Sequence, residues 1–311
     1  MQVERSAVTR GRWASLAPRA SFVVVVGFFA AMSASAATLD RVRESGHLKL
    51  GYLADARPLS FRTESGADGY GVALCQRVAD ELKSQTGLGG LTVDWVPVEP
   101  GNLLGDVQQG NIDLLCVPAS VTLERRQQVS FSIPVYPGGI RAAVRADAPA
   151  ELREALGDTP TGRPVWRGSP AAKVLSGSSF GAVSGTTAEG WLAERLKTFQ
   201  MDAKAVGVPD YKAGVQQLLD RKVNVLFGDP SVILAATDPA SRDKLTILDR
   251  RFTHEPFALA LARNDDDFRL LVDGALSKLY RSSDLQPLYR KWFGEFDEGT
   301  RLFFLWNTPP Q

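Results

Sequence analysis

Hydroxyl and guanidinium side chains follow the apolar run Ile112–Val117. Ser120 and Thr122 come first, and Thr122 can N-cap a helix that places Arg125 at its third position. Free backbone N–H groups at a helix start and a guanidinium together favour an anion such as a carboxylate. The same spacing also fits a capped helix in which Arg125 is simply solvated. Arg126 is expected to point elsewhere and to be solvated. Spacing alone leaves both interpretations open.

Two further strand ends carry similar chemistry. In VSGTTAEG, Thr186 can N-cap a helix, with Glu189 completing a capping box. Gly185 allows a tight turn that leaves the amides of Thr186 and Thr187 open to an anion, although the pattern also fits a capping box with no ligand. Asp229 ends the apolar run VNVLFG, where it can bind an ammonium group or simply cap the next helix. Together the three ends complement the zwitterionic head group of an α-amino acid.

The order of predicted elements positions these ends. Apolar runs typical of strands alternate with amphipathic stretches typical of helices in two successive units of roughly 100 residues, followed by a helical tail. Such alternation indicates an α/β fold with a largely parallel sheet, and open sheets of this kind bind ligands at the carboxyl ends of their strands. One short helix is expected to start at an N-cap, Thr38, and to end at Gly46.

The first 36 residues have the layout of a secretory signal peptide. Four arginines precede an apolar run of about eleven residues. The motif Ala34-Ser35-Ala36 follows this run and is typical of a cleavage site. The run is short for a membrane span, which needs roughly 20 residues. We expect cleavage near Ala36, with an uncleaved anchor as the alternative. Cleavage removes four arginines and one glutamate from totals of 36 basic and 35 acidic residues, leaving a net charge of about −2.

This balanced composition argues against a nucleic acid or an anionic membrane as partner. The pattern of residues indicates neither a metal site nor a cofactor, and His47 and His254 are expected at the surface or a hinge. Both cysteines, Cys75 and Cys116, lie in the exported part, where an even number favours a disulfide over two buried free thiols.

Six stretches in this order resemble the periplasmic amino-acid-binding proteins of ABC importers. They are TLDRVRESGHLKLGY, PLSF with GYGVALCQRVADEL, GNIDLLCVPASVTLERRQQVSFS, SGTTAE, VLFGDP and LYRKWF. The resemblance runs from Thr38 to Gly294. It implies a two-lobed periplasmic-binding-protein fold of type II, with two α/β lobes joined by two hinge strands.

The expected organisation follows from that fold. We place the signal peptide at 1–36, the first lobe at 37–139 and 256–311, and the second lobe at 140–255. The resemblance implies capture of an amino acid or a related small carboxylate by a periplasmic, monomeric protein. It further implies delivery of that ligand to an ABC permease.

The family motif assigns roles to the same strand ends. By resemblance, Arg125 and Ser120 hold the ligand's α-carboxylate with help from the amides of Thr186 and Thr187, and Asp229 holds the α-ammonium. Three further residues, Phe61, Leu53 and Leu103, are expected to complete the ligand site.

Several positions depart from the family pattern. Glutamate/aspartate binders place arginines where this chain has Leu53 and Leu103, although Arg57 could substitute. Histidine- and glutamine-binding members of the family place an aromatic residue near the position that Ala56 occupies here. Pro118 removes one backbone N–H donor from the expected carboxylate site. These departures predict a less polar pocket than that of a dicarboxylate binder.

Two other functions remain open. The first is a periplasmic enzyme on the same scaffold, of the prephenate/arogenate dehydratase type, for which Glu255 and Glu99 are the candidate acids or bases. The second is a ligand sensor whose closed lobes dock on another receptor. The apolar tail after Gly294 could contribute to such docking, although packing onto the first lobe is the simpler expectation.

Overall fold

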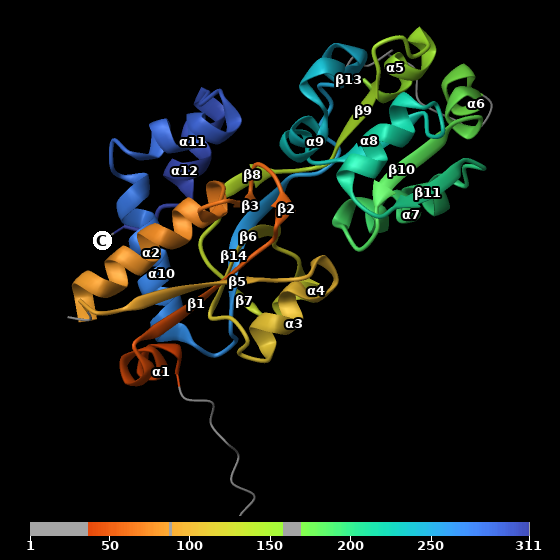
Figure 1. The fold of residues 1–311 in the computed structure, drawn as a ribbon. Helices are drawn as coiled ribbons and strands as arrows, with labels where there is room; N and C mark the ends of the chain where they lie inside the picture. The colour runs from red at the N-terminus through yellow and green to blue at the C-terminus, as the bar shows by residue number, and fades with distance from the viewer. Residues whose placement is uncertain (1–36, 87–88, 158–168, 311) are drawn as a thin grey trace, which may run out of the picture. The chain divides into compact units, whose positions relative to one another are not determined.

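The computed structural model describes residues 37–86, 89–157 and 169–310, and its strands form three sheets (Figure 1). The predicted signal peptide lies outside the described residues. Two of the sheets, each flanked by helices, make the two α/β lobes, which confirms the predicted fold class. Among the described residues, no helix combines the length and apolar character needed to cross a bilayer.

The first sheet has the order β5-β1-β6-β14-β7, with β8 paired to β14. Strand β6 is almost wholly buried and β1 is mostly buried, as expected of strands covered on both faces. β14 is antiparallel to β6, β7 and β8 because it returns from the second lobe. The strands are β1 His47–Tyr52, β5 Thr92–Pro97, β6 Leu114–Ser120, β7 Ser130–Phe131, β8 Tyr136–Gly138 and β14 Glu255–Leu261.

Strand β6 continues to Ser120, three residues beyond the predicted strand end at Val117. Its pairing with β14 shifts register between Ala258 and Ala260, opposite the part of β6 that contains Pro118. Proline has no N–H to give to the ladder, so an irregular pairing at this point is expected.

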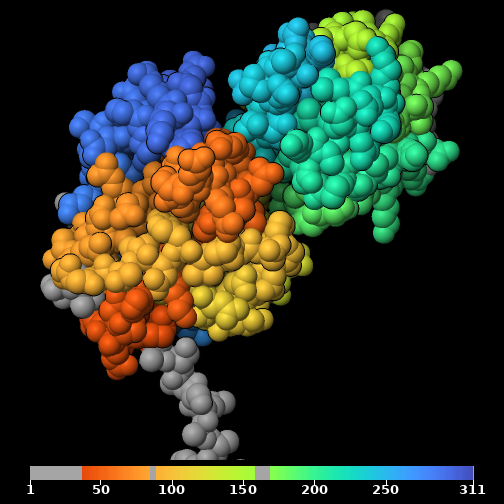
Figure 2. Space-filling view, in the orientation of Figure 1, coloured from red at the N-terminus to blue at the C-terminus, as the bar shows by residue number. Residues whose placement is uncertain are grey.

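Helices of the first lobe pack on this sheet, and α2 lies beside the C-terminal helices (Figures 1 and 2). Their buried side chains include Tyr70, Leu74 and Phe268. The helices are α1 Thr38–Ser45, α2 Tyr70–Thr86, η1 Pro100–Asn102, α3 Leu103–Gln108, α4 Leu123–Arg126, α10 Asp266–Tyr280, α11 Leu285–Phe293 and α12 Glu298–Trp306. A small antiparallel sheet adds β2 Asp55–Ala56, β3 Ser60–Thr63 and β4 Gly66–Asp68.

The predicted N-cap of α1 is wrong, whereas its predicted end is confirmed. Ala37 occupies the N-cap position, and Thr38 is the first helical residue, whose N–H is bound by Asp265 Oδ2 at 2.9 Å. The amides of Asp40 and Arg41, which a Thr38 cap would have bound, donate to the Ala37 carbonyl instead. Gly46 ends the helix with a φ of 73°, and its N–H donates to Val42 O.

The second sheet has the order β11-β10-β12-β9-β13. β10 is parallel to β11 and β12, whereas β9 is antiparallel to β12 and β13. Separate apolar clusters cover its two faces, one under α5, α6 and α7 and the other under α8 and α9. The elements are β9 Arg141–Arg145, α5 Ala150–Leu156, α6 Pro170–Ser176, β10 Ser179–Val183, α7 Thr187–Phe199, β11 Lys204–Val208, α8 Tyr211–Leu219, β12 Val225–Gly228, α9 Pro230–Ala236, η2 Pro239–Lys244 and β13 Leu245–Ile247.

The C-terminal helix packs back onto the first lobe, as expected for the apolar tail. Phe304 is 2% exposed and its ring contacts those of Tyr280, Tyr289 and Phe296. Trp306 lies on the other side of α12 and is 83% exposed.

The disulfide between Cys75 and Cys116 is formed and joins α2 to β6 in the buried core of the first lobe. It therefore fixes the helix that covers the sheet to the strand that leads to Arg125.

Removing this bond is predicted to destabilise the first lobe. The two cysteines are 41 residues apart, and closing such a loop stabilises by about 3 to 4 kcal/mol in the chain-entropy model. We expect the double variant Cys75→Ala, Cys116→Ala to lose about that much free energy of unfolding in urea titrations. The oxidised parent protein is the control. An unchanged unfolding midpoint would show that the disulfide adds no stability.

Candidate functional site

Arg125 is held in place by its own turn of the chain. Thr122 is the N-cap of α4, as predicted, and its side chain accepts a hydrogen bond from Arg125 N at 3.1 Å. The Arg125 Nη1 donates to the carbonyl of Ser120 at 3.0 Å. Arg126 is exposed, as expected. Because α4 has only four residues, its dipole is small, and the guanidinium itself is the candidate group for binding an anion.

The guanidinium of Arg125 keeps most of its donors for a ligand. Burial lowers the pKa of Arg125, an effect that the negative charges of Glu255 and Glu124 oppose. Among the described residues, no carboxylate lies within ion-pair distance of this arginine. A half-buried, unpaired arginine of this kind is well suited to a ligand carboxylate.

Asp229 is a buried carboxylate at the end of β12, with 6% exposure. It N-caps α9, since its Oδ1 accepts from Ser231 N at 2.9 Å and from Ser231 Oγ at 2.5 Å. The Tyr136 hydroxyl also donates to Oδ1 at 3.2 Å, and Gly139 N donates to Oδ2 at 3.4 Å. Burial raises the pKa of the Asp229 carboxyl, although its hydrogen-bond donors oppose that effect.

The SGTT turn adopts a different cap from the one predicted. Thr186 occupies the N-cap position of α7, but its hydroxyl donates to Val183 O at 2.6 Å and makes no cap bond. Glu189 accepts from Gly185 N at 2.8 Å instead of Thr186 N. Gly185 has a φ of 77°, a left-handed conformation that a glycine adopts easily. The capping-box prediction is therefore wrong, and so is the expectation that the Thr186 amide is open, because it donates to Val183 O at 3.3 Å.

Glu255 is the first residue of β14, and its side chain contacts residues of other segments. Its Oε2 accepts from the Thr187 hydroxyl at 2.6 Å, and its Oε1 accepts from the Thr253 hydroxyl at 2.8 Å. It pairs with Gly138 of β8, next to the Gly139 amide that donates to Asp229. The following residue, Pro256, accepts a hydrogen bond from Val121 N, beside Ser120. Ser120 and Thr187 therefore contact the Glu255–Phe257 segment directly. Arg125 is linked to it through Ser120, and Asp229 through Tyr136, which pairs with Phe257.

Two tyrosines complete the polar site and were not expected from the sequence. Tyr136 donates to Asp229, and Tyr211 lies against Gly228, where an added Cβ would be only 2.6 Å from the Tyr211 ring. Burial, followed by the charges of Asp229 and Glu255, raises the pKa of Tyr211. Both contacts join residues far apart in sequence, so no local pattern marks them.

The apolar candidates lie around the first sheet. Leu53 and Leu103 are partly buried against the cluster of Val98, Leu115 and Val117. Phe61 is 5% exposed, with Trp292 edge-on at 5.8 Å between ring centroids. Arg57 lies over the Phe61 ring at 3.5 Å, so its guanidinium is engaged in a cation–π contact.

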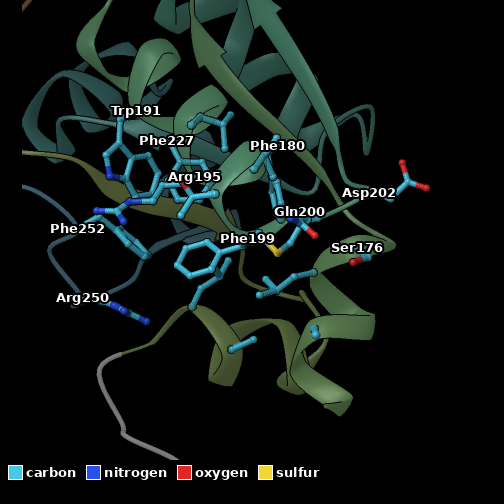
Figure 3. A pocket seen from close by; sticks show the side chains of 18 of the residues that line it. Ser176, Phe180, Trp191, Arg195, Phe199, Gln200, Asp202, Phe227, Arg250 and Phe252 are labelled. Carbon is cyan, nitrogen blue, oxygen red and sulfur yellow. The ribbon is translucent and has the colours of Figure 1, made fainter. Parts of the chain in front are cut away.

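A hollow of about 740 Å³ lies elsewhere, in the second lobe (Figure 3). Its wall is mainly apolar and includes the aromatic side chains of Trp191, Phe227 and Phe252. None of the predicted ligand residues lines it. The polar groups that match an amino-acid head group are at the Glu255 segment, and we therefore take that segment as the candidate site.

Similarities to known proteins agree with this geometry. The model of the bacterial extracellular solute-binding proteins, family 3, matches residues 48–295. The L-cystine-binding protein TcyJ of Escherichia coli (strain K12) is 24% identical over 279 residues, covering 88% of this chain and 93% of TcyJ. The cyclohexadienyl dehydratase of Pseudomonas aeruginosa is 35% identical, but over only 35% of this chain and 39% of the enzyme.

A solved structure shares the fold. The ancestral amino acid-binding protein AncCDT-1, described as a precursor of cyclohexadienyl dehydratase, has a TM-score of 0.65 and 24% identity, covering 83% of this chain and all of that one. With its family model matched over most of its length, the chain belongs to the bacterial extracellular solute-binding proteins, family 3.

Proposed function

We propose that the protein captures an amino acid outside the cytoplasm and delivers it to an ABC permease. The observation that carries this proposal is Arg125, which is fixed by Ser120 yet has no anionic partner among the described residues. Family membership supports the class of function. The periplasmic location, cleavage near Ala36 and the monomeric state are part of the same proposal.

Arg125 takes the α-carboxylate of the ligand. Its fork can donate two parallel hydrogen bonds to a carboxylate while Nη1 keeps its bond to the Ser120 carbonyl. The α7 helix has 13 residues and begins at Thr187. The N–H groups of its first turn add hydrogen-bond donors at the positive end of the helix dipole, which favours a carboxylate. Hydrogen bonds to charged groups contribute about 1.5–3 kcal/mol each.

Asp229 takes the α-ammonium. Its Oδ2 accepts only one long bond, from Gly139 N at 3.4 Å, and so retains acceptor capacity. An ammonium at this position offsets the desolvation of the carboxylate. Leu53 and Leu103 then line the side-chain region, which argues against a dicarboxylate ligand.

A periplasmic dehydratase is the second candidate, supported by the partial match to cyclohexadienyl dehydratase. Of its two possible acid–base residues, Glu99 is exposed and Glu255 is held by two threonine hydroxyls. An enzyme consumes a prephenate-like substrate in a steady-state assay, whereas a binding protein shows only saturable binding.

Replacing Arg125 tests the carboxylate clamp. In a thermal-shift screen against the twenty amino acids, a ligand at 100 times its Kd stabilises the protein by about 2.7 kcal/mol. We expect Arg125→Ala to abolish this shift and Arg126→Ala, a matched control on the same helix, to preserve it. A full shift in Arg125→Ala would contradict the assignment.

The pH dependence of affinity tests Asp229. Only the ionised carboxylate attracts an ammonium, so affinity is present above the Asp229 pKa and is lost as pH falls through it. Because burial raises that pKa, we expect the loss to begin at a higher pH than for an ordinary aspartate with a pKa of 3.8. Tyr136 and Tyr211 stay neutral here, because burial raises their pKa values. Calorimetry from pH 7 to 4 should show this loss, with a flat and weaker profile in Asp229→Asn; identical profiles would contradict the role.

A further inference from the structure

Glu255 brings a second negative charge to the proposed ligand site. Its carboxylate accepts a hydrogen bond from Thr187, the first residue of α7. The next residue of β14, Pro256, accepts a hydrogen bond from Val121 N through its carbonyl. Glu255 is near enough to Arg125 for its charge to raise that residue's pKa. The charges of Glu255 and Asp229 both act on Tyr211. The two carboxylates and Arg125 therefore belong to one electrostatic environment.

The position of the Glu255 carboxylate is fixed, but its charge is not neutralised. One threonine hydroxyl binds each oxygen, which leaves each oxygen able to accept a further hydrogen bond. Among the described residues, no lysine or arginine forms an ion pair with Glu255 or Asp229. Arg251, on the segment leading into β14, donates to the carbonyls of Pro137 and Gly138 instead.

A neutral amino acid does not balance these charges. Its carboxylate pairs with Arg125 and its ammonium with one of the two acidic residues. The other carboxylate then loses water on ligand binding without gaining a cation, which opposes binding. A ligand with one more positive charge removes this imbalance.

We infer that Glu255 is a second anionic contact of the ligand site and that it selects amino acids with an additional cationic nitrogen, such as a guanidinium or a second ammonium. This inference rests on the proposed amino-acid-binding function. Two preplaced oxygens suit the planar fork of a guanidinium in particular. The aliphatic stem of such a side chain also suits the apolar surface of Leu53 and Leu103.

The test compares ligands with and without this additional positive charge. Calorimetry measures the Kd of the mature protein for arginine and for citrulline, its neutral and nearly isosteric counterpart, and then for lysine and norleucine. We expect arginine to bind at least about tenfold tighter than citrulline, a difference of about 1.4 kcal/mol. In Glu255→Gln this preference should fall to about threefold or less, with citrulline affinity little changed. Glu99→Gln, which removes an exposed glutamate, should retain the parent preference.

The outcomes separate this inference from the function on which it rests. If arginine and citrulline bind equally well to the parent protein, and Arg125→Ala abolishes both, the function stands and the role of Glu255 is overturned. The same conclusion follows if Glu255→Gln weakens both ligands equally, because Glu255 then only ties α7 to β14. Absence of binding by every amino acid overturns both proposals. The parent protein's preference is measurable even if Glu255→Gln fails to fold.

Discussion

The antiparallel pairing of β14 with β6 is the constraint on which the candidate site depends. It aligns Phe257 with Ser120, and the Val121 amide donates to Pro256, so the strand returning from the second lobe runs beside the turn that holds Arg125. Residues more than 100 positions apart in the chain thereby meet. Glu255, one residue before that contact, reaches Thr187 of the second lobe. Without this pairing, the arginine and the acidic residues would not belong to one candidate site.

The site combines groups that are individually unfavourable to bury. Asp229 is almost fully buried, and its hydrogen-bond donors reduce but do not cancel the effect of desolvation on its pKa. Arg125 is half-buried without an ion-pair partner among the described residues. In the proposed binding mode, a zwitterionic ligand supplies the missing charge to both. Ligand binding and folding stability are therefore coupled through the same residues, because the ligand compensates a desolvation already present in the free protein.

Local features of the site could be predicted from the sequence, whereas long-range ones could not. The Thr122 cap and the Gly46 terminator depend on neighbouring residues and are confirmed. The Thr38 cap fails because the helix begins one residue earlier, with Ala37 at the N-cap and Thr38 inside the helix, where its amide is bound by Asp265, 227 residues away. The capping box fails because the left-handed turn at Gly185 offers its own amide to Glu189. The contacts of Tyr136 and Thr187 with the acidic residues join distant segments, and only the fold reveals them.

The central claim is that the protein recognises both charges of an amino-acid head group. Calorimetric titration of a bound amino acid, its analogue lacking the α-amino group and its analogue lacking the carboxylate tests this directly. If Arg125 and Asp229 act as proposed, each analogue should bind about a hundredfold more weakly or worse, since each loses charge-assisted hydrogen bonds. Binding of either analogue as tightly as the parent amino acid would contradict the account.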